Sequence, residues 1–147
     1  MHDLLIIGCG DIGRRVAALA IKESASVTGL IRSAEKAPLL EQQGIRVVNA
    51  NLDEPSSLSG LPAKGTIVFY LAPPPGGGHV DTRVRNFCGA IAPGEEPTKV
   101  VYMSTSGVYG DCSDEWVTED TPPNPQTARG KRRLDAETVL TAWGKER

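Results

Sequence analysis

The feature that most constrains this chain is a set of three glycines directly after its first apolar run. Residues 4–7 read Leu-Leu-Ile-Ile, and Gly8, Gly10 and Gly13 follow in the spacing G-x-G-x-x-G. Apolar residues then recur at helical spacing from Ile12 onward. The sequence therefore predicts a buried strand, a tight turn and a helix, in that order.

Each of these glycines has a physical reason in that context. Gly8 permits the tight turn, Gly10 lets a pyrophosphate approach the backbone, and Gly13 allows the helix to pack closely on the strand. The free N–H groups at the start of the helix also favour a diphosphate. The pattern indicates a dinucleotide site, and the alternative is a glycine-rich turn that holds no ligand.

Composition excludes several other classes of protein. The chain has 147 residues, of which 39% are hydrophobic and 5% aromatic, so we expect one domain over residues 1–147 with an aliphatic core. A formal net charge of −2 provides no basic field for nucleic acid. No apolar run approaches the ~20 residues of a membrane span, and no secretory signal pattern is present. The three cysteines have unrelated spacings, so we expect a cytoplasmic protein with neither disulfides nor a metal site.

Segments with strand and helix patterns alternate along the whole chain. We expect strands over 4–7, 26–31, 45–49, 66–71 and 99–104. We expect a first helix that starts near Ile12 and three further helices over about 34–43, 80–91 and 127–143. A Pro/Gly-rich stretch over 72–78 forbids regular structure after the fourth strand. This alternation predicts an α/β fold, a doubly wound Rossmann-type parallel sheet in the strand order 3-2-1-4-5.

In such a sheet a ligand lies across the carboxyl ends of the strands. The expected cofactor-binding residues are Gly8, Cys9, Gly10, Asp11, Ile12, Gly13, Arg32, Ser33, Asn51, Leu52, Leu71, Ala72 and Pro73. An acidic residue about 20 positions after the glycines would bind the ribose 2′-hydroxyl of NAD. Arg32 stands there instead, with Ser33 beside it, and a guanidinium can bind a 2′-phosphate bidentately. NADP is therefore favoured over NAD, and the alternative is an ordinary solvated arginine at a strand end.

Two further motifs follow the fourth and fifth predicted strands. They read Tyr70-Leu-Ala-Pro and Ser104-Thr-Ser-Gly-Val-Tyr-Gly110. With the glycine motif, they make the chain resemble the extended and atypical short-chain dehydrogenases/reductases, the family of NAD(P)-dependent epimerases and dehydratases. The resemblance implies an oxidoreductase or epimerase that acts on a small carbonyl or sugar-like substrate.

The resemblance also implies catalytic positions. In that family a Ser or Thr after the fifth strand polarises the substrate oxygen, and here the position is Thr105. A Tyr-x-x-x-Lys pair on the next helix transfers the proton, and its positions hold Arg129 and Arg133. Arginine stays protonated near neutral pH, so it cannot serve as a general base. A shifted register offers Thr127 and Lys131, but a threonine hydroxyl is far too weak an acid to replace a phenol.

Arg129 and Arg133 lie four residues apart and would share one helix face. That face could hold an anionic substrate group or a cofactor phosphate, or both side chains could be solvated. The departure from the Tyr-x-x-x-Lys pair keeps a second function open. That function is a non-catalytic NADP-binding or redox-sensing module.

Relatives in this family continue past the last helix with a sixth strand and a substrate-binding portion. The sequence here stops at Arg147, so the fifth strand would be an unpaired edge with an apolar stretch over 99–103. Such an edge pairs readily with another chain. We therefore expect a homodimer, and the alternative is a poorly soluble monomer.

Overall fold

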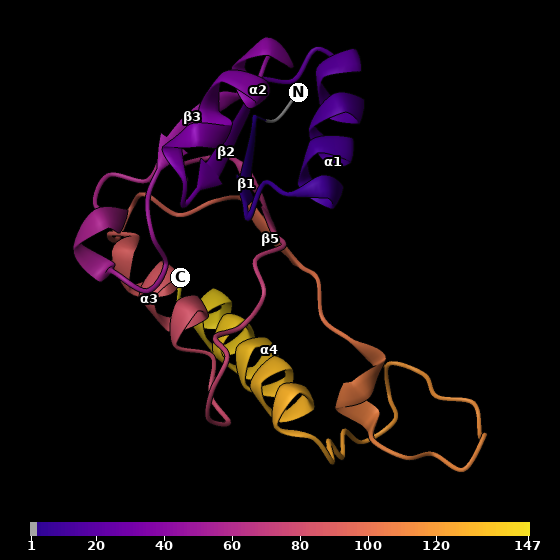
Figure 1. Cartoon of the computed structure of the whole chain (residues 1–147). Coiled ribbons are helices and arrows are strands. Elements are labelled where there is room, and N and C mark those ends of the chain that lie inside the picture. The colour runs from indigo at the N-terminus through magenta and orange to yellow at the C-terminus, as the bar shows by residue number, and fades with distance from the viewer. Residues whose placement is uncertain (1–2) are drawn as a thin grey trace.

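The computed structural model describes residues 3–147 and contains one parallel sheet between two layers of helices (Figure 1). The strands are β1 (Leu4–Ile7), β2 (Val27–Ile31), β3 (Arg46–Asn49), β4 (Ile67–Tyr70) and β5 (Lys99–Tyr102). They lie in the order β3-β2-β1-β4-β5, and all neighbouring pairs are parallel. The predicted fold class and strand order are confirmed.

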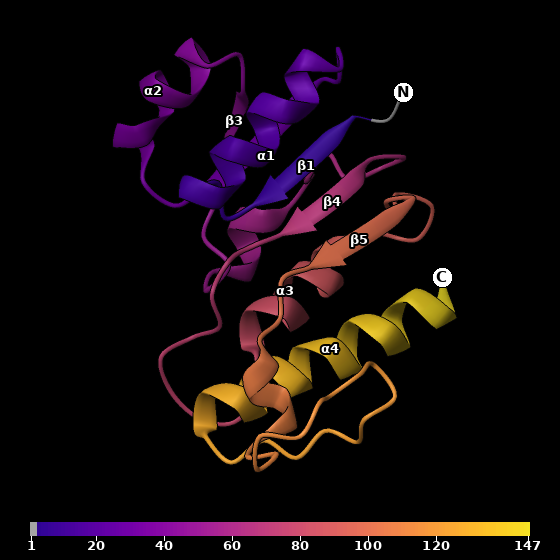
Figure 2. The ribbon, with the colours of Figure 1, turned by 90° about the vertical axis from the view of Figure 1, so that its right-hand side faces the viewer.

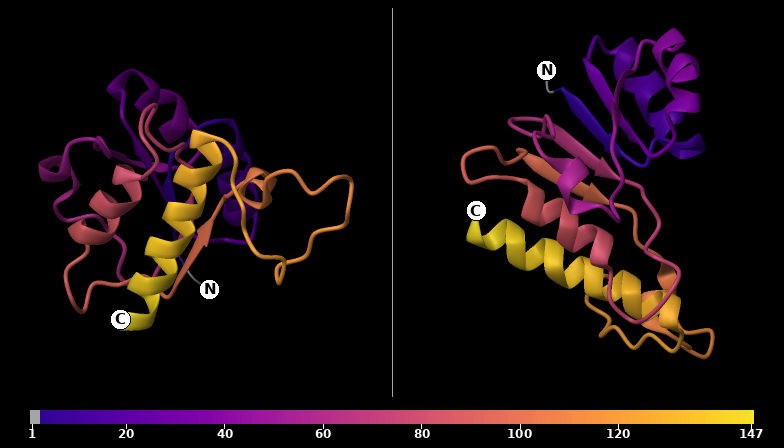
Figure 3. Two further views of the ribbon diagram at one scale, coloured as in Figure 1. Left: turned by 90° about the horizontal axis from the view of Figure 1, so that it is seen from below. Right: turned by 60° about the vertical axis from the view of Figure 1, so that its left-hand side comes forward.

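The helices cover both faces of the sheet. They are α1 (Asp11–Lys22), α2 (Ala37–Gln42), α3 (Thr82–Ala90) and α4 (Ala128–Glu146), with short 3₁₀ turns η1 (Ala34–Lys36), η2 (Pro55–Leu58) and η3 (Ser106–Tyr109). Figure 2 shows α1 and α2 on one side of the sheet and α3 and α4 on the other, and Figure 3 shows the same layers from two further directions.

Two predicted elements differ in detail from the observed ones. The expected helix over 34–43 is divided into η1 and α2, with Pro38 in the first turn of α2. Proline has no N–H to donate and fits only the first turn, so a new helix begins there. The strand expected over 99–104 ends at Tyr102, because its partner β4 ends at Tyr70, the residue paired with Tyr102.

The central strand β1 explains why the first apolar run does not alternate. Leu4 and Ile6 belong to the apolar cluster under α1 and α2, whereas Leu5 and Ile7 belong to the cluster under α3 and α4. A strand covered by helices on both faces buries every side chain. The same register aligns Ile7 with Leu30 of β2 and with Tyr70 of β4, so the segments that follow these strands meet at one edge of the sheet.

Residues 3–147 lack two kinds of feature. No helix in that range is long and apolar enough to cross a membrane. No group of three or more His, Cys, Asp or Glu side chains there is arranged to hold a metal ion.

Candidate functional site

A cleft of about 360 Å³ opens at the carboxyl ends of β1, β2, β3 and β4. Its lining residues are Gly8, Cys9, Gly10, Leu30, Ile31, Arg32, Ser33, Lys36, Ala50, Asn51, Leu52, Leu71, Ala72, Pro73 and Arg83. All of the predicted cofactor-binding residues lie in this lining except Asp11, Ile12 and Gly13. The structure therefore brings together residues that are up to 65 positions apart in sequence, from Gly8 to Pro73.

The three glycines of the turn have three different surroundings. Gly8 has a φ of +89°, and a Cβ there would lie 2.7 Å from the amide nitrogen of Ala72. A Cβ on Gly13 would lie 3.1 Å from the carbonyl oxygen of Gly8. At Gly10 a Cβ would meet nothing within 4 Å, although Gly10 lines the cleft. Gly8 and Gly13 are thus required by packing, whereas the room beside Gly10 is free for a ligand to approach the backbone.

Cys9 is part of the turn but its side chain is buried. Only 6% of the residue is exposed, and a Cβ on Gly29 of β2 would lie 3.1 Å from its Sγ. The glycine in β2 therefore makes room for the thiol. Burial also raises the pKa of the Cys9 thiol, so it stays protonated and acts as a small apolar side chain in this contact.

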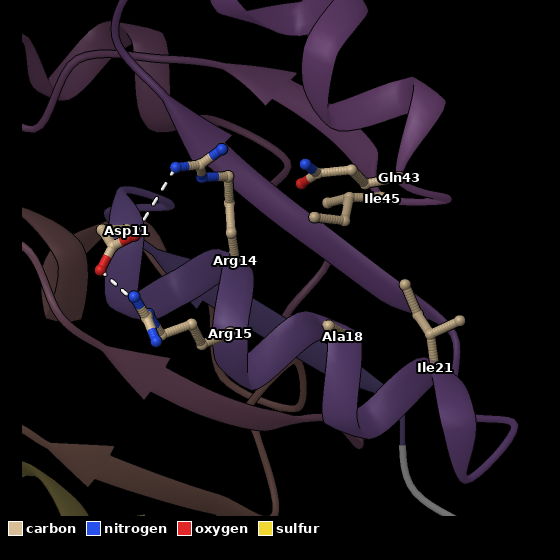
Figure 4. Close-up of a pocket in the computed structure, with 7 residues that line it drawn as sticks. All are labelled: Asp11, Arg14, Arg15, Ala18, Ile21, Gln43 and Ile45. Carbon is tan, nitrogen blue, oxygen red and sulfur yellow. Dashed lines mark hydrogen bonds and ion pairs between the residues drawn. The ribbon is translucent and has the colours of Figure 1, made fainter.

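Asp11 lies outside the cleft, on the outer side of α1. Its carboxylate pairs with Arg14 at 3.7 Å and with Arg15 at 3.0 Å (Figure 4). A wide surface hollow of about 530 Å³ lies between α1 and the residues just before β3. The same figure shows side chains that line it, Gln43 and Ile45 among them. This hollow is larger than the cleft, but it contains none of the glycines. Arg14 and Arg15 both pair with Asp11 there, outside the cleft.

Basic side chains gather where β2 ends. Arg32 follows the strand directly and is exposed, Ser33 precedes η1, and Lys36 is the last residue of η1. All three line the cleft. In the part of the chain that the structure describes, neither Arg32 nor Lys36 forms an ion pair. This corner of the cleft is therefore positively charged, and Lys36 is a lining residue that the sequence analysis missed.

The loop after β3 is held by its own polar groups. The Asn51 side chain accepts a hydrogen bond from the N–H of Asp53 at 3.0 Å and donates one to Glu54 at 3.0 Å. The Ser57 hydroxyl accepts from the Asn51 N–H at 2.9 Å. Asn51 thus shapes the turn, and it lines the cleft together with Leu52.

Arg83 of α3 is the second lining residue that the sequence analysis missed. Its guanidinium donates to both carboxylate oxygens of Asp53, at 2.8 and 2.7 Å, and to the Pro73 carbonyl at 3.0 Å. The Arg83 guanidinium lowers the pKa of the Asp53 carboxyl. Because Asp53 and Arg83 are 30 residues apart, no local pattern in the sequence predicts their contact.

The predicted catalytic positions lie outside the lining of the cleft, Thr105 after β5 and Arg129 and Arg133 on α4. Thr105 precedes η3, and its hydroxyl accepts a hydrogen bond from the Gly107 N–H at 3.3 Å. The neighbouring Ser104 hydroxyl donates to Glu137 of α4. Of these two hydroxyls, that of Ser104 already donates its proton, whereas that of Thr105 only accepts and can still donate.

Arg133 is not solvated, contrary to one of the two alternatives for this helix face. It is 8% exposed and donates to the Met103 carbonyl at 2.7 Å and to the Tyr102 hydroxyl at 3.3 Å. Its guanidinium carbon lies 5.7 Å from the centre of the Tyr102 ring. Arg129, one turn earlier, is exposed. The two arginines therefore have different environments, because only Arg133 packs against the end of β5.

Comparison with known proteins agrees with this geometry. The profile of the NAD(P)H-binding family matches residues 8–142. A segment of 59 residues, 40% of this chain, is 36% identical to the photosystem II assembly factor Ycf39 of Synechocystis, of which it covers 18%.

Solved structures share the fold over nearly the whole chain. A protein of Methylobacillus flagellatus assigned as an NAD-dependent epimerase/dehydratase is 32% identical with a TM-score of 0.77, over 96% of this chain and 50% of that one. The UDP-glucuronic acid 4-epimerase of Bacillus cereus is 20% identical with a TM-score of 0.74, over 97% of this chain and 52% of that one. The chain therefore spans about half the length of these proteins.

The family profile covers most of the chain, and the glycine turn opens on a cleft with free space beside Gly10. The chain belongs to the NAD(P)H-binding family, and it is an NAD(P)-binding domain with the Rossmann fold of the epimerase/dehydratase and short-chain dehydrogenase/reductase proteins.

Proposed function

We propose that this chain binds NADP(H) in preference to NAD(H). The observation that carries the proposal is the pair of cations, Arg32 and Lys36, that line the cleft after β2 without an acidic partner among residues 3–147. The nearest carboxylate, that of Asp53, is close enough to Arg32 for the arginine to lower its pKa, but it pairs with Arg83, so a 2′-phosphate would give Arg32 and Lys36 a direct partner. In this proposal the pyrophosphate lies on the turn from Gly8 to Gly10, against the start of α1.

The remaining wall residues would hold the adenosine. Asn51 and Leu52 line the cleft from the loop after β3, and Leu71, Ala72 and Pro73 line it from the loop after β4. Both sides are largely apolar or backbone surface, which suits a flat heterocycle. Ser33 would add a hydroxyl beside Arg32.

We further propose that the domain serves an oxidoreductase or epimerase reaction on a small carbonyl or sugar-like substrate. The bound nicotinamide would supply hydride transfer. The contribution of this chain would be Thr105, whose hydroxyl keeps its proton and can donate it to a substrate oxygen. Arg129 is exposed on the first turn of α4 and could hold an anionic group of the substrate.

The environment of Arg133 favours a second candidate, a non-catalytic NADP(H)-binding or redox-sensing module. Arg133 stands at the family lysine position, yet its guanidinium is buried against the Met103 carbonyl and the Tyr102 ring. It is therefore not free to hold a nicotinamide ribose without breaking those contacts. Hydride exchange with a panel of carbonyl compounds separates the two candidates.

In that assay, turnover that Thr105→Val abolishes and Thr105→Ser retains would support the enzyme. Ser106→Ala is the matched control, because Ser106 is exposed next to Thr105. NADPH binding without turnover on any compound would support the non-catalytic module.

The cofactor preference has its own test. Calorimetric titration with NADPH and NADH should show tighter binding of NADPH to the wild type. Arg32→Ala should weaken NADPH by about tenfold or more, the value of one charge-assisted contact, and leave NADH unchanged. Arg46→Ala is the control, because Arg46 is an exposed arginine of β3 that bonds Ser26 and does not line the cleft. Equal affinity for the two cofactors would contradict the role given to Arg32.

We also propose a homodimer that forms through β5. This strand lies at the edge of the sheet, and Val101 and Met103 beside it are 38% and 45% exposed. An apolar edge of this kind pairs with a second strand. Sedimentation equilibrium should show a dimer that Val101→Lys dissociates, and a wild-type monomer would contradict the proposal.

A further inference from the structure

The first turn of α3, on the face of the sheet opposite α1 and α2, contributes Arg83 to the lining of the cleft. Arg83 and Arg85 both lie in that turn, where a cation is opposed by the helix dipole. Each is paired with a carboxylate: Arg83 with Asp53 at 2.7 Å and Arg85 with Asp135 at 2.6 Å. The helix dipole therefore disfavours arginine at these two positions, and the ion pairs with Asp53 and Asp135 compensate for it.

The two pairs connect to different parts of the molecule. Arg85 and Asp135 join α3 to α4. Arg83 instead joins α3 to the loop after β3 through Asp53, and to the loop after β4 through the Pro73 carbonyl. Residues of both loops line the cleft and form two of its walls, and Arg83, which also lines it, bonds to both loops.

A second side chain of α3 supports the same wall. The Asn86 amide donates to the Leu52 carbonyl at 2.7 Å, one residue before Asp53. The side chain of Arg83 is only 18% exposed, and its Nε, NH1 and NH2 atoms are all engaged with protein acceptors. The Arg83 guanidinium is thus already hydrogen-bonded to Asp53 and Pro73 in the ligand-free protein.

We propose that Arg83 is a positioning residue for the cofactor, which acts through Asp53 and Pro73 to hold the two walls of the cleft at their binding separation. This inference rests on the proposed function, because it concerns the affinity of the same cleft. Loops that are already ordered bind more tightly, since no ordering cost is added on binding. Removal of either partner should therefore weaken any dinucleotide, with or without a 2′-phosphate.

The alternative role for Arg83 is a direct charge on a cofactor phosphate. The two roles predict opposite results for Asp53→Asn. If Arg83 acts directly on phosphate, loss of the Asp53 charge frees the guanidinium and the affinity rises or stays constant. If Arg83 positions the walls, Asp53→Asn weakens binding as Arg83→Gln does.

The test is a double-mutant cycle read by calorimetric titration of NADPH and NADH. Arg83→Gln and Asp53→Asn should each weaken both cofactors by about tenfold, and the double variant should be no weaker than either single variant. Arg85→Gln is the matched control, because it breaks a bidentate pair on the same helix away from the cleft, and its affinities should equal those of the wild type.

Amide hydrogen exchange of the ligand-free protein provides a second readout. The amides of residues 51–54 and of Ala72 should exchange faster in Arg83→Gln and Asp53→Asn than in the wild type or Arg85→Gln. Unchanged affinity in both variants, or weaker binding in Arg83→Gln alone, would overturn the inference. A wild type that binds neither cofactor would overturn the proposed function, and the inference with it.

Discussion

The carboxyl edge of the sheet has two halves with different chemistry. After β1, β2 and β3, the side chains of Arg32 and Lys36 face a cleft, and neither has an ion-pair partner in the described part of the chain. After β5, the polar groups bond to one another: Ser104 to Glu137, and Arg133 to the end of the strand.

The surface after β2 can therefore bind an anion, whereas Ser104 and Arg133 after β5 already have hydrogen-bond partners within the protein. A cation without a partner gains from any phosphate that arrives, whereas a buried guanidinium already bonded to a carbonyl loses those bonds if it moves. The half after β2 therefore has unused capacity to bind an anion, whereas Ser104 and Arg133 in the half after β5 are bonded within the protein. Three predictions follow this contrast.

The largest effect is expected at Gly8. Gly8→Ala would place a Cβ 2.7 Å from the Ala72 nitrogen at a φ of +89°, so the free energy of unfolding should fall by about 3 kcal/mol or more. Gly10→Ala meets no atom within 4 Å and should cost about 1 kcal/mol or less. Chemical denaturation measures both.

Cofactor titration then sharpens the comparison. Because the open space beside Gly10 is where a pyrophosphate would approach, Gly10→Ala should weaken NADPH by at least about tenfold while the protein remains stable. Unchanged NADPH affinity in stable Gly10→Ala would show that the space has no part in binding.

The second effect is expected at Arg133. Arg133→Met would leave the Met103 carbonyl without its buried donor and would remove a nearby positive charge from Asp81, so unfolding should become easier by about 2–4 kcal/mol. Arg129→Met, at an exposed site on the same helix, should change stability by less than about 0.5 kcal/mol. Thermal and denaturant unfolding provide the measurement.

The opposite pattern would break the contrast between the two halves. If Arg133→Met were as stable as Arg129→Met and instead bound NADPH more weakly, Arg133 would be a ligand-binding residue. The carboxyl end of β5 would then belong to the open half of the edge.

The fold could be predicted because its signals are local. The run at 4–7, the glycine turn and the alternation of apolar segments each lie within a few residues. These signals decide the type of each element, and right-handed crossovers then leave few strand orders. The candidate cofactor residues followed from the strand ends alone, since parallel strands place their carboxyl ends together.

The contacts of the arginines could not be predicted in this way. Arg32 is exposed, whereas Arg133 is buried with 8% of the residue exposed. The two side chains are identical, and nothing in the local sequence indicates this difference. The burial of Arg133 depends on β5 ending at Tyr102, which leaves the Met103 carbonyl for the guanidinium. The pairing of Arg83 with Asp53 likewise depends on how α3 packs over the loop after β3.

The smallest effect is a pH dependence of opposite sign in the two halves. Asp81 caps α3, is fully buried, and its Oδ2 has no partner among residues 3–147. Burial raises the pKa of the Asp81 carboxyl above its ordinary 3.8, although the Val84 N–H and the charge of Arg133 oppose the shift. The pKa of Asp53 is instead lowered from 3.8, chiefly by its hydrogen bond to Arg83.

The signs follow from which state holds the proton more tightly. For Asp81 the folded state does, so its contribution to stability is complete below pH 3.8 and is lost as the pH rises through the folded-state pKa. For Asp53 the unfolded state does, so its contribution is present above pH 3.8 and is lost as the pH falls through the folded-state pKa. The Asp53 contribution should be below about 1 kcal/mol, because the pair is partly exposed and screened by solvent.

Denaturant unfolding of Asp81→Asn and Asp53→Asn from pH 3 to 7, measured against the wild type, tests both signs at once. Asparagine also caps helices well, so Asp81→Asn should gain stability relative to the wild type as the pH rises, while Asp53→Asn should lose it. Parallel curves for the two variants would mean that Asp81 is ionised and compensated like Asp53, and that a fixed cation near Asp81, Arg133 above all, outweighs its burial.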